Sequence, residues 1–223
     1  MGWIMSEEIS RRSFLSGSLL GLAALSISLA SGKKSAAKKK EGPLHVDVDH
    51  SGQDLDDTSV GVLVVANAPK HLDTMRRLRK DLQYFRPLRH NSTDLRRVPY
   101  GNALIDYFLK TDDMRFVAVV TSHGSPRLDD LAVALKHLRK GGLGASLDPA
   151  VLARAAAVRK GLKGVAADEI GQLADVLTGA VYVDFSRSPS QRRSEFAKAL
   201  KQKLKASRLA PFNGHPRFSV ITG

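Results

Sequence analysis

The stretch that most constrains the fold is Thr58–Ala66, TSVGVLVVA, because it is almost wholly apolar and rich in valine. A run of this length and composition predicts a strand buried on both faces of a sheet. Leu44–Gly52, LHVDVDHSG, predicts a strand before it and ends in a Ser-Gly turn signal. Its residues alternate, so Val46 and Val48 fall on one face while Asp47 and Asp49 fall on the other. We expect these two strands to pair.

The rest of the chain predicts an α/β fold. Met114–Thr121 is a third strand pattern, Phe218–Ile221 a short terminal one, and the aromatic residues of Asp81–Phe85 favour a short strand there as well. The predicted helices are Pro69–Lys80, Ser92 or Thr93 to about Lys110 with a break near Pro99 and Gly101, Leu128–Leu138, Asp148 to about Val158, Asp168–Tyr182 and Pro189–Ser207. The strand-helix-strand order predicts parallel neighbours in a helix-covered sheet.

The helix Asp168–Tyr182 and the strand that delivers Asp49 carry the most informative polar residues. On a helical wheel Leu173, Val176, Leu177 and Ala180 form an apolar stripe, and Asp175 lies on the adjoining stripe, at the border of the core. Asp49 allows two interpretations, which are a carboxylate that caps its own turn and a catalytic or metal-binding carboxylate.

Composition limits the choice of partners and of chemistry. The chain has 223 residues, of which 43% are apolar, and this is enough for one core, so we expect one domain at 43–223. The formal net charge is +13, and five lysines lie between Lys33 and Lys40. Such an excess favours nucleic acid or an anionic membrane surface as a partner, and it also fits simple solubility. Because there is no cysteine, thiolate metal sites and cysteine nucleophiles are excluded.

The first 32 residues have the form of a twin-arginine export signal. Arg11 and Arg12 are followed in register by Phe14 and Leu15, and then by a charge-free run at 17–30 that ends in Ser-Leu-Ala. The run is shorter than the roughly 20 residues that cross a bilayer. We expect export by the twin-arginine translocase to the periplasm or the cell exterior, with membrane contact only through this signal segment. Residues 33–42 are expected to form a basic flexible linker. The alternative is a chance Arg-Arg pair on a cytoplasmic protein.

Three short motifs together resemble the prokaryotic family called domain of unknown function 3800. They are Asp49-His50-Ser51-Gly52, Asp81-Leu82-Gln83-Tyr84, and the sequence QLADVLTGA at Gln172–Ala180. The family patterns that they are similar to are Asp-Glu-Ser-Gly, Glu-x-Lys-Trp and Gln-x-Ala-Asp-x-x-x-Gly-Ala. The resemblance covers the chain from about Pro43 to its end, and the third motif is the most specific.

The resemblance implies a ribonuclease H-like three-layer fold, with a mixed central sheet flanked by helices. It further implies that Asp49, Asp81 and Asp175 are the catalytic carboxylates, which hold Mg²⁺ or Mn²⁺ for phosphodiester cleavage. Hard oxygen ligands of this kind suit those ions. Ser51, Gln172 and Arg86 are the candidate substrate-binding residues.

The chain departs from the family pattern at three motif positions, and Asp47 also stands where an apolar residue is common in the family. His50 stands where glutamate is usual, Asp81 is one methylene shorter than the family's glutamate, and Gln83 lacks the charge of its lysine. The alternative to a metal-dependent nuclease is therefore an inactive domain that binds nucleic acid or an anionic surface. A third possibility is an envelope protein whose basic linker meets anionic lipid.

The signal interpretation is tested by changing both Arg11 and Arg12 to lysine. This change is expected to leave a full-length precursor in the cytoplasm, because twin-arginine transport depends on the arginine pair. Cell fractionation with detection of the chain's size measures this outcome. Recovery of the unaltered protein in the cytoplasm without cleavage would show that the segment is no export signal.

Overall fold

The structure is a computed structural model. It describes residues 44–52, 57–89, 94–122, 128–140, 143, 147–150, 152–153, 155, 168–186 and 194–223. The predicted export signal, the basic linker and the predicted helix caps Ser92 and Thr93 lie outside the described residues.

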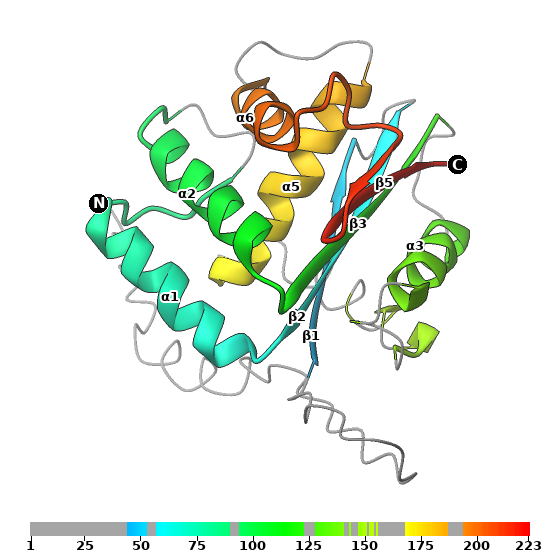
Figure 1. Ribbon diagram of the computed structural model, residues 1–223, viewed down its shortest axis with the longest axis horizontal. Helices are drawn as coiled ribbons and strands as arrows, with labels where there is room; N and C mark the ends of the chain where they lie inside the picture. The colour runs from blue at the N-terminus through cyan, green and yellow to red at the C-terminus, as the bar shows by residue number, and fades with distance from the viewer. Residues whose placement is uncertain are drawn as a thin grey trace, which may run out of the picture.

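A mixed five-stranded sheet forms the centre of the fold (Figure 1). Its strands are β1 (Leu44–Ser51), β2 (Thr58–Ala66), β3 (Met114–Thr121), β4 (Phe212–His215) and β5 (Phe218–Thr222), in the order β1-β2-β3-β5-β4. The pairs β1–β2, β2–β3 and β4–β5 are antiparallel, and β3–β5 is parallel. The predicted pairing of the first two strands is thus confirmed, and β1 lies at an edge of the sheet.

Helices cover both faces of this sheet and give three layers (Figure 1). The described helices are α1 (Ala68–Asp81), α2 (Arg97–Lys110), α3 (Leu128–Lys140), α5 (Glu169–Phe185) and α6 (Ser194–Leu204). α3 packs on one face, while α1, α2, α5 and α6 occupy the other. Each face has its own hydrophobic cluster, the larger one under α2 and α5 and the smaller one under α3.

The residue pattern of β1 and β2 explains this layering. All nine residues of β2 are buried, as its apolar run predicts. In β1 the alternation is confirmed, because Val48 belongs to the cluster under α3. Asp47 and Asp49 therefore face the opposite layer, which contains α5. The sequence thus directs polar side chains of an edge strand toward a helix.

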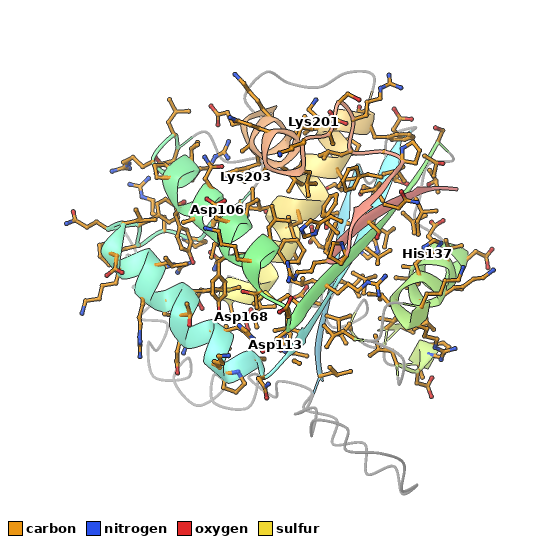
Figure 2. All side chains as sticks on the ribbon, viewed as in Figure 1. Asp106, Asp113, His137, Asp168, Lys201 and Lys203 are labelled. Carbon is orange, nitrogen blue, oxygen red and sulfur yellow. The ribbon has the colours of Figure 1, made fainter. Side chains whose placement is uncertain are left out.

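Ion pairs attach α6 to its neighbours on that layer. Lys201 Nζ lies 2.5 Å from Asp184 Oδ1 on α5, and Lys203 Nζ lies 2.7 Å from Asp106 Oδ1 on α2. Lys201, Lys203 and Asp106 are labelled in Figure 2. Phe196 and Leu200 of α6 are buried in the same cluster. α6 therefore closes the layer over α2 and α5.

The predicted parallel arrangement of consecutive strands is wrong for β2 and β3. Two helices, α1 and α2, connect them, and the second helix returns the chain to the end of β2 that it left. The backbone N–H of Ala66 donates to the carbonyl of Asp113 at 2.8 Å, which places the start of β3 beside the end of β2. Antiparallel pairing follows from this return.

The predicted strand at Asp81–Phe85 is also wrong. Asp81 is the last residue of α1, and the N–H groups of Leu82, Gln83 and Tyr84 donate to carbonyls of that helix. Gln83 has φ 52, the left-handed conformation that commonly ends a helix. The aromatic residues that suggested a strand instead lie in an irregular segment, where Tyr84 is buried against Tyr100.

The predicted break near Pro99 does not occur, because α2 begins at Arg97 and runs unbroken to Lys110. Pro99 therefore lies in the first turn, where its missing N–H leaves no hydrogen bond unmade. Gly101 lies against the ring of Phe196 on α6, and a side chain there would overlap the ring.

Gly61 of β2 sets how closely α5 approaches the sheet. A Cβ at this position would collide with Thr178 Oγ1 and would lie 2.7 Å from the ring of Phe116. Gly61→Ala is expected to lower the free energy of unfolding by about 1–3 kcal/mol, because the helix must shift. Chemical denaturation measures the loss.

A double-mutant cycle makes this test specific. In a Thr178→Ala background the cost of Gly61→Ala should be smaller, because one of the two overlapping side chains is gone. Gly214→Ala serves as the matched control, since its nearest neighbour, the Phe212 ring, is 3.2 Å away and the residue is exposed. Equal costs of Gly61→Ala in both backgrounds would contradict the described contact of α5 with β2.

Candidate functional site

Two polar surfaces face each other between β1 and α5. Thr178 lies over Gly61, and the ring of Tyr182 lies over Gly52. Gly61 is the ladder partner of Asp49. Asp175, Thr178 and Tyr182 have the spacing i, i+3 and i+7, so they share one helical face. The face of α5 that carries Asp175 is therefore turned toward the face of β1 that carries Asp49.

Gly52 completes the end of β1 in this region. Its φ of 82 is the left-handed conformation that glycine adopts at little cost. A Cβ at this position would overlap both the ring of Tyr182 and the carbonyl oxygen of Asp57. The Ser-Gly turn predicted from the sequence thus allows α5 to pack closely over the strand end.

Three hydroxyl groups lie beside Asp49 on this side of the sheet. Asp49 is 7% exposed, and Ser51, Ser59 and Thr178 are buried. Ser51 and Ser59 are direct partners in the β1–β2 ladder. Their Oγ atoms and Thr178 Oγ1 are buried and have no hydrogen-bond partner in the described part of the chain. A buried polar atom without a partner costs free energy, which makes these hydroxyls candidates for contact with a bound ligand.

Access to the two carboxylates differs. Asp49 is buried, whereas Asp175 is only half-buried although nearly every other residue from Glu169 to Val183 is buried. Asp47, one pleat before Asp49, is also half-buried. Because β1 is an edge strand, the carboxylates lie at the rim of the sheet and not under its centre. Solvent therefore reaches this site from the side of Asp47 and Asp175.

Asp81, the third predicted carboxylate, is placed differently. It is exposed at the last position of α1. Within the described ranges, no group of three or more histidine, aspartate or glutamate side chains is arranged so that it could hold a metal ion. The structure thus places Asp49 and Asp175 on facing elements and does not bring Asp81 to them as part of such a group.

The predicted substrate-binding residues have other contacts. Gln172 is buried, and its Oε1 accepts hydrogen bonds from Arg79 Nη2 and, at 2.8 Å, from the backbone N–H of Leu88. Arg86 is exposed, with Nη1 3.5 Å from Asp94 Oδ2. Of Ser51, Gln172 and Arg86, only Ser51 belongs to β1, and it lies on the strand face that carries Asp49.

An ion-pair cluster, which the sequence did not predict, fixes the start of α5. Asp168 Oδ1 caps the helix by accepting from Gly171 N at 2.9 Å. Glu169 is buried and lies 3.4 Å from both Arg76 Nε and Arg79 Nη1 of α1. The Arg79 guanidinium also lies 5.2 Å from the centre of the Tyr100 ring. This cluster holds α5 against α1 and thereby sets the position of Asp175.

His50 lies on the other side of the sheet from Asp49, because adjacent strand residues point to opposite faces. Burial lowers the pKa of His50, and the charge of Asp130 on α3 opposes that shift. Position 50, at which the family that the sequence resembles has glutamate, thus faces α3. A glutamate at position 50 would point away from Asp49, so the two side chains could not form one site.

Comparison of the chain with protein-family models, with curated proteins and with solved structures found no match. The family resemblance therefore stays a prediction. Among the described residues no helix is long and apolar enough to cross a membrane.

The lowered pKa of His50 predicts the direction in which the stability of the fold changes with pH. Because the folded-state pKa lies below the ordinary value of 6.5, the unfolded chain binds more protons near that pH. The contribution of His50 to stability is therefore present above pH 6.5 and is lost as the pH falls through the folded-state pKa. NMR titration should give a pKa below 6.5, and His50→Gln should flatten the loss of stability on acidification. A pKa at or above 6.5 would contradict the described burial.

Proposed function

We propose that this chain is a divalent-cation-dependent phosphodiesterase that acts on nucleic acid, on a domain of ribonuclease H-like fold. The observation that carries the proposal is the opposition of Asp49 on β1 and Asp175 on α5, beside three buried hydroxyls that have no partner within the described ranges. A divalent cation bound between β1 and α5 could be held by carboxylates from both elements.

The donor set fits a hard cation that binds together with its substrate. Magnesium keeps several waters in proteins and is commonly held by one or two carboxylates plus substrate phosphate oxygens. Asp49 and Asp175 would be those carboxylates, with Mg²⁺ or Mn²⁺ as the ion. The exposed position of Asp81 makes it a weaker candidate for a ligand.

A cation held here would polarise a phosphoryl oxygen and lower the pKa of a bound water. The side chains of the protein would orient the substrate and would donate hydrogen bonds to it. The hydroxyls of Ser51, Ser59 and Thr178 would donate to oxygens of the bound group, and their burial would keep them in fixed orientation. Tyr182, which packs over the turn at Gly52, would limit entry of water from the end of β1.

The choice of nucleic acid as substrate rests on charge. The outer surface of α1 and the segment after it expose the side chains of Arg76, Arg77, Lys80, Arg86 and Arg89. Clustered cations of this kind neutralise a phosphate backbone and release its counterions. The export signal proposed for residues 1–32 would place this activity outside the cytoplasm.

A second candidate function is an inactive domain that binds nucleic acid or an anionic surface. It is favoured by the absence of a three-carboxylate group in the described ranges. Gln83, at the position of the family's lysine, is exposed in a left-handed turn and carries no charge. Both features fit a domain that binds a polyanion through its cationic surface and catalyses no reaction.

Thermal unfolding with and without divalent cation tests the site. At ten times its dissociation constant, Mg²⁺ or Mn²⁺ should stabilise the fold by about 1.4 kcal/mol, which is about 3–6 °C for a chain of this size. Asp49→Asn and Asp175→Asn should each remove the shift, because asparagine keeps the shape and removes the charge. Asp81→Asn is the matched control and should retain it.

Hydrolysis of a fluorescent oligonucleotide separates the two candidates. A cation-dependent shift together with cleavage that is lost in Asp49→Asn supports the phosphodiesterase. Binding of the oligonucleotide in a gel-shift assay, with neither a cation-dependent shift in melting temperature nor cleavage, supports the inactive binding domain. Melting temperatures that neither ion changes would show that Asp49 and Asp175 do not hold a cation.

A further inference from the structure

The connection between α1 and α2 carries an unusual exposed surface. In the part of the chain that the structure describes, the exposed large hydrophobic side chains are Leu82, Phe85 and Leu95, at 42%, 74% and 64% exposure. All three belong to this connection or to the turn that begins α2. Single exposed apolar residues need no explanation, but a group at one place marks an interaction surface.

Contacts on both sides of Phe85 hold it in this outward position. Tyr84 is buried, stacks on Tyr100 with ring centres 5.5 Å apart, and donates its hydroxyl to the carbonyl of Pro87 at 3.3 Å. Leu88 is buried, and its N–H donates to Gln172 on α5. The backbone on either side of Phe85 is thus anchored to the core, while Phe85 itself remains exposed.

An ion pair brings the start of α2 to the same place. Arg86 Nη1 lies 3.5 Å from Asp94 Oδ2, so the residue after Phe85 is joined to the residue before Leu95. Asp94 also accepts hydrogen bonds from the backbone N–H and the side chain of Arg96. Leu82 lies three residues before Phe85, directly after the end of α1. We call these residues, Leu82, Phe85 and Leu95 with their flanking cations, the connector patch.

The flanking charge of the connector patch is strongly positive. The exposed cations are Arg77, Lys80, Arg86, Arg89 and Arg96. The acids among them are Asp81, which is exposed, and Asp94, whose side chain is 17% exposed and is bound by two arginines. An apolar centre with a cationic rim complements a surface that has an apolar interior and anionic headgroups.

We propose that the connector patch docks onto the surface of an anionic phospholipid bilayer. Leu82, Phe85 and Leu95 enter the boundary between headgroups and acyl chains, and the surrounding arginines contact lipid phosphates. Two of the three apolar residues are leucines, which have no aromatic face on which a nucleobase could stack. The aliphatic composition therefore favours lipid over single-stranded nucleic acid. The proposal does not depend on the carboxylates, which lie on β1 and α5. It shares four cations, Arg77, Lys80, Arg86 and Arg89, with the nucleic-acid surface of the proposed function, so lipid and nucleic acid would compete for this face.

A tryptophan introduced at position 85 tests the proposal at the patch itself. The chain has one tryptophan, Trp3, so the full-length double variant Trp3→Phe, Phe85→Trp reports from position 85 alone. A local reporter is needed because the apolar run at 17–30 can bind bilayers by itself. Equimolar phosphatidylcholine–phosphatidylglycerol vesicles should shift the emission of the introduced tryptophan to shorter wavelength, and dibrominated lipid should quench it. Pure phosphatidylcholine vesicles should give a much weaker response.

Matched variants assign the effect to apolar contact and to charge. In the background of this double variant, Leu95→Ser should lower vesicle affinity about tenfold, and Arg89→Gln about fivefold, which is about 1 kcal/mol for one cation near an anionic surface. Arg208→Gln is the control, because Arg208 is also exposed but lies between α6 and β4. An unchanged melting temperature confirms that each variant is folded.

Two results would overturn the proposal. The first is emission from the introduced tryptophan that stays unshifted while the protein sediments with the vesicles, since binding would then occur elsewhere. The second is quenching of that tryptophan by an oligothymidine together with no response to vesicles. That result would make the connector patch a nucleic-acid surface.

Discussion

The contact of α5 with β1 and β2 determines the rest of this structure. Gly61 has no side chain, and so Thr178 lies directly over the strand and α5 packs close to the sheet. Gly52, in a left-handed conformation, allows the same approach at Tyr182. The start of the helix is fixed separately by Glu169, which pairs with two arginines of α1. Between these points the helix has little freedom, so Asp175 faces β1.

The same packing accounts for the polar character of the candidate site. β1 is an edge strand that directs Val46 and Val48, with His50 after them, toward α3 and polar residues toward α5. An apolar strand face would make a simpler contact with a helix, and leaving hydroxyls buried without partners costs free energy. Sites that break the rule of apolar packing are often functional. We therefore propose that the functional site lies between β1 and α5 and not at the exposed end of α1.

Much of the fold could be predicted because several elements each show one clear pattern of apolar and polar residues. β2 is continuously apolar, β1 alternates, and α5 has a capping aspartate before an apolar helical stripe. β4, with the sequence FNGH, was missed because it is short and polar. The sequence does not predict the antiparallel pairing of β2 and β3, because the order of the elements does not determine at which end of β2 the two-helix connection brings the chain back to the sheet. The positions of Ser59 and Thr178 beside Asp49 depend on ladder register and on how closely α5 packs on the sheet, and no local sequence pattern contains this information. Asp81 is a candidate only through its motif, and motif spacing does not reveal that the residue is the exposed last residue of α1.

Iron-mediated cleavage can locate a bound cation on the chain. Fe²⁺ can replace Mg²⁺ at oxygen sites and generates hydroxyl radicals that cut the backbone nearby. With ascorbate and peroxide, we expect cuts near Asp49 in β1, near Asp175 in α5 and in the part of β2 around Gly61, the ladder partner of Asp49. Excess Mg²⁺ should suppress all of these cuts. Cuts confined to the end of α1 near Asp81, or no Mg²⁺-sensitive cuts at all, would contradict a cation site between β1 and α5.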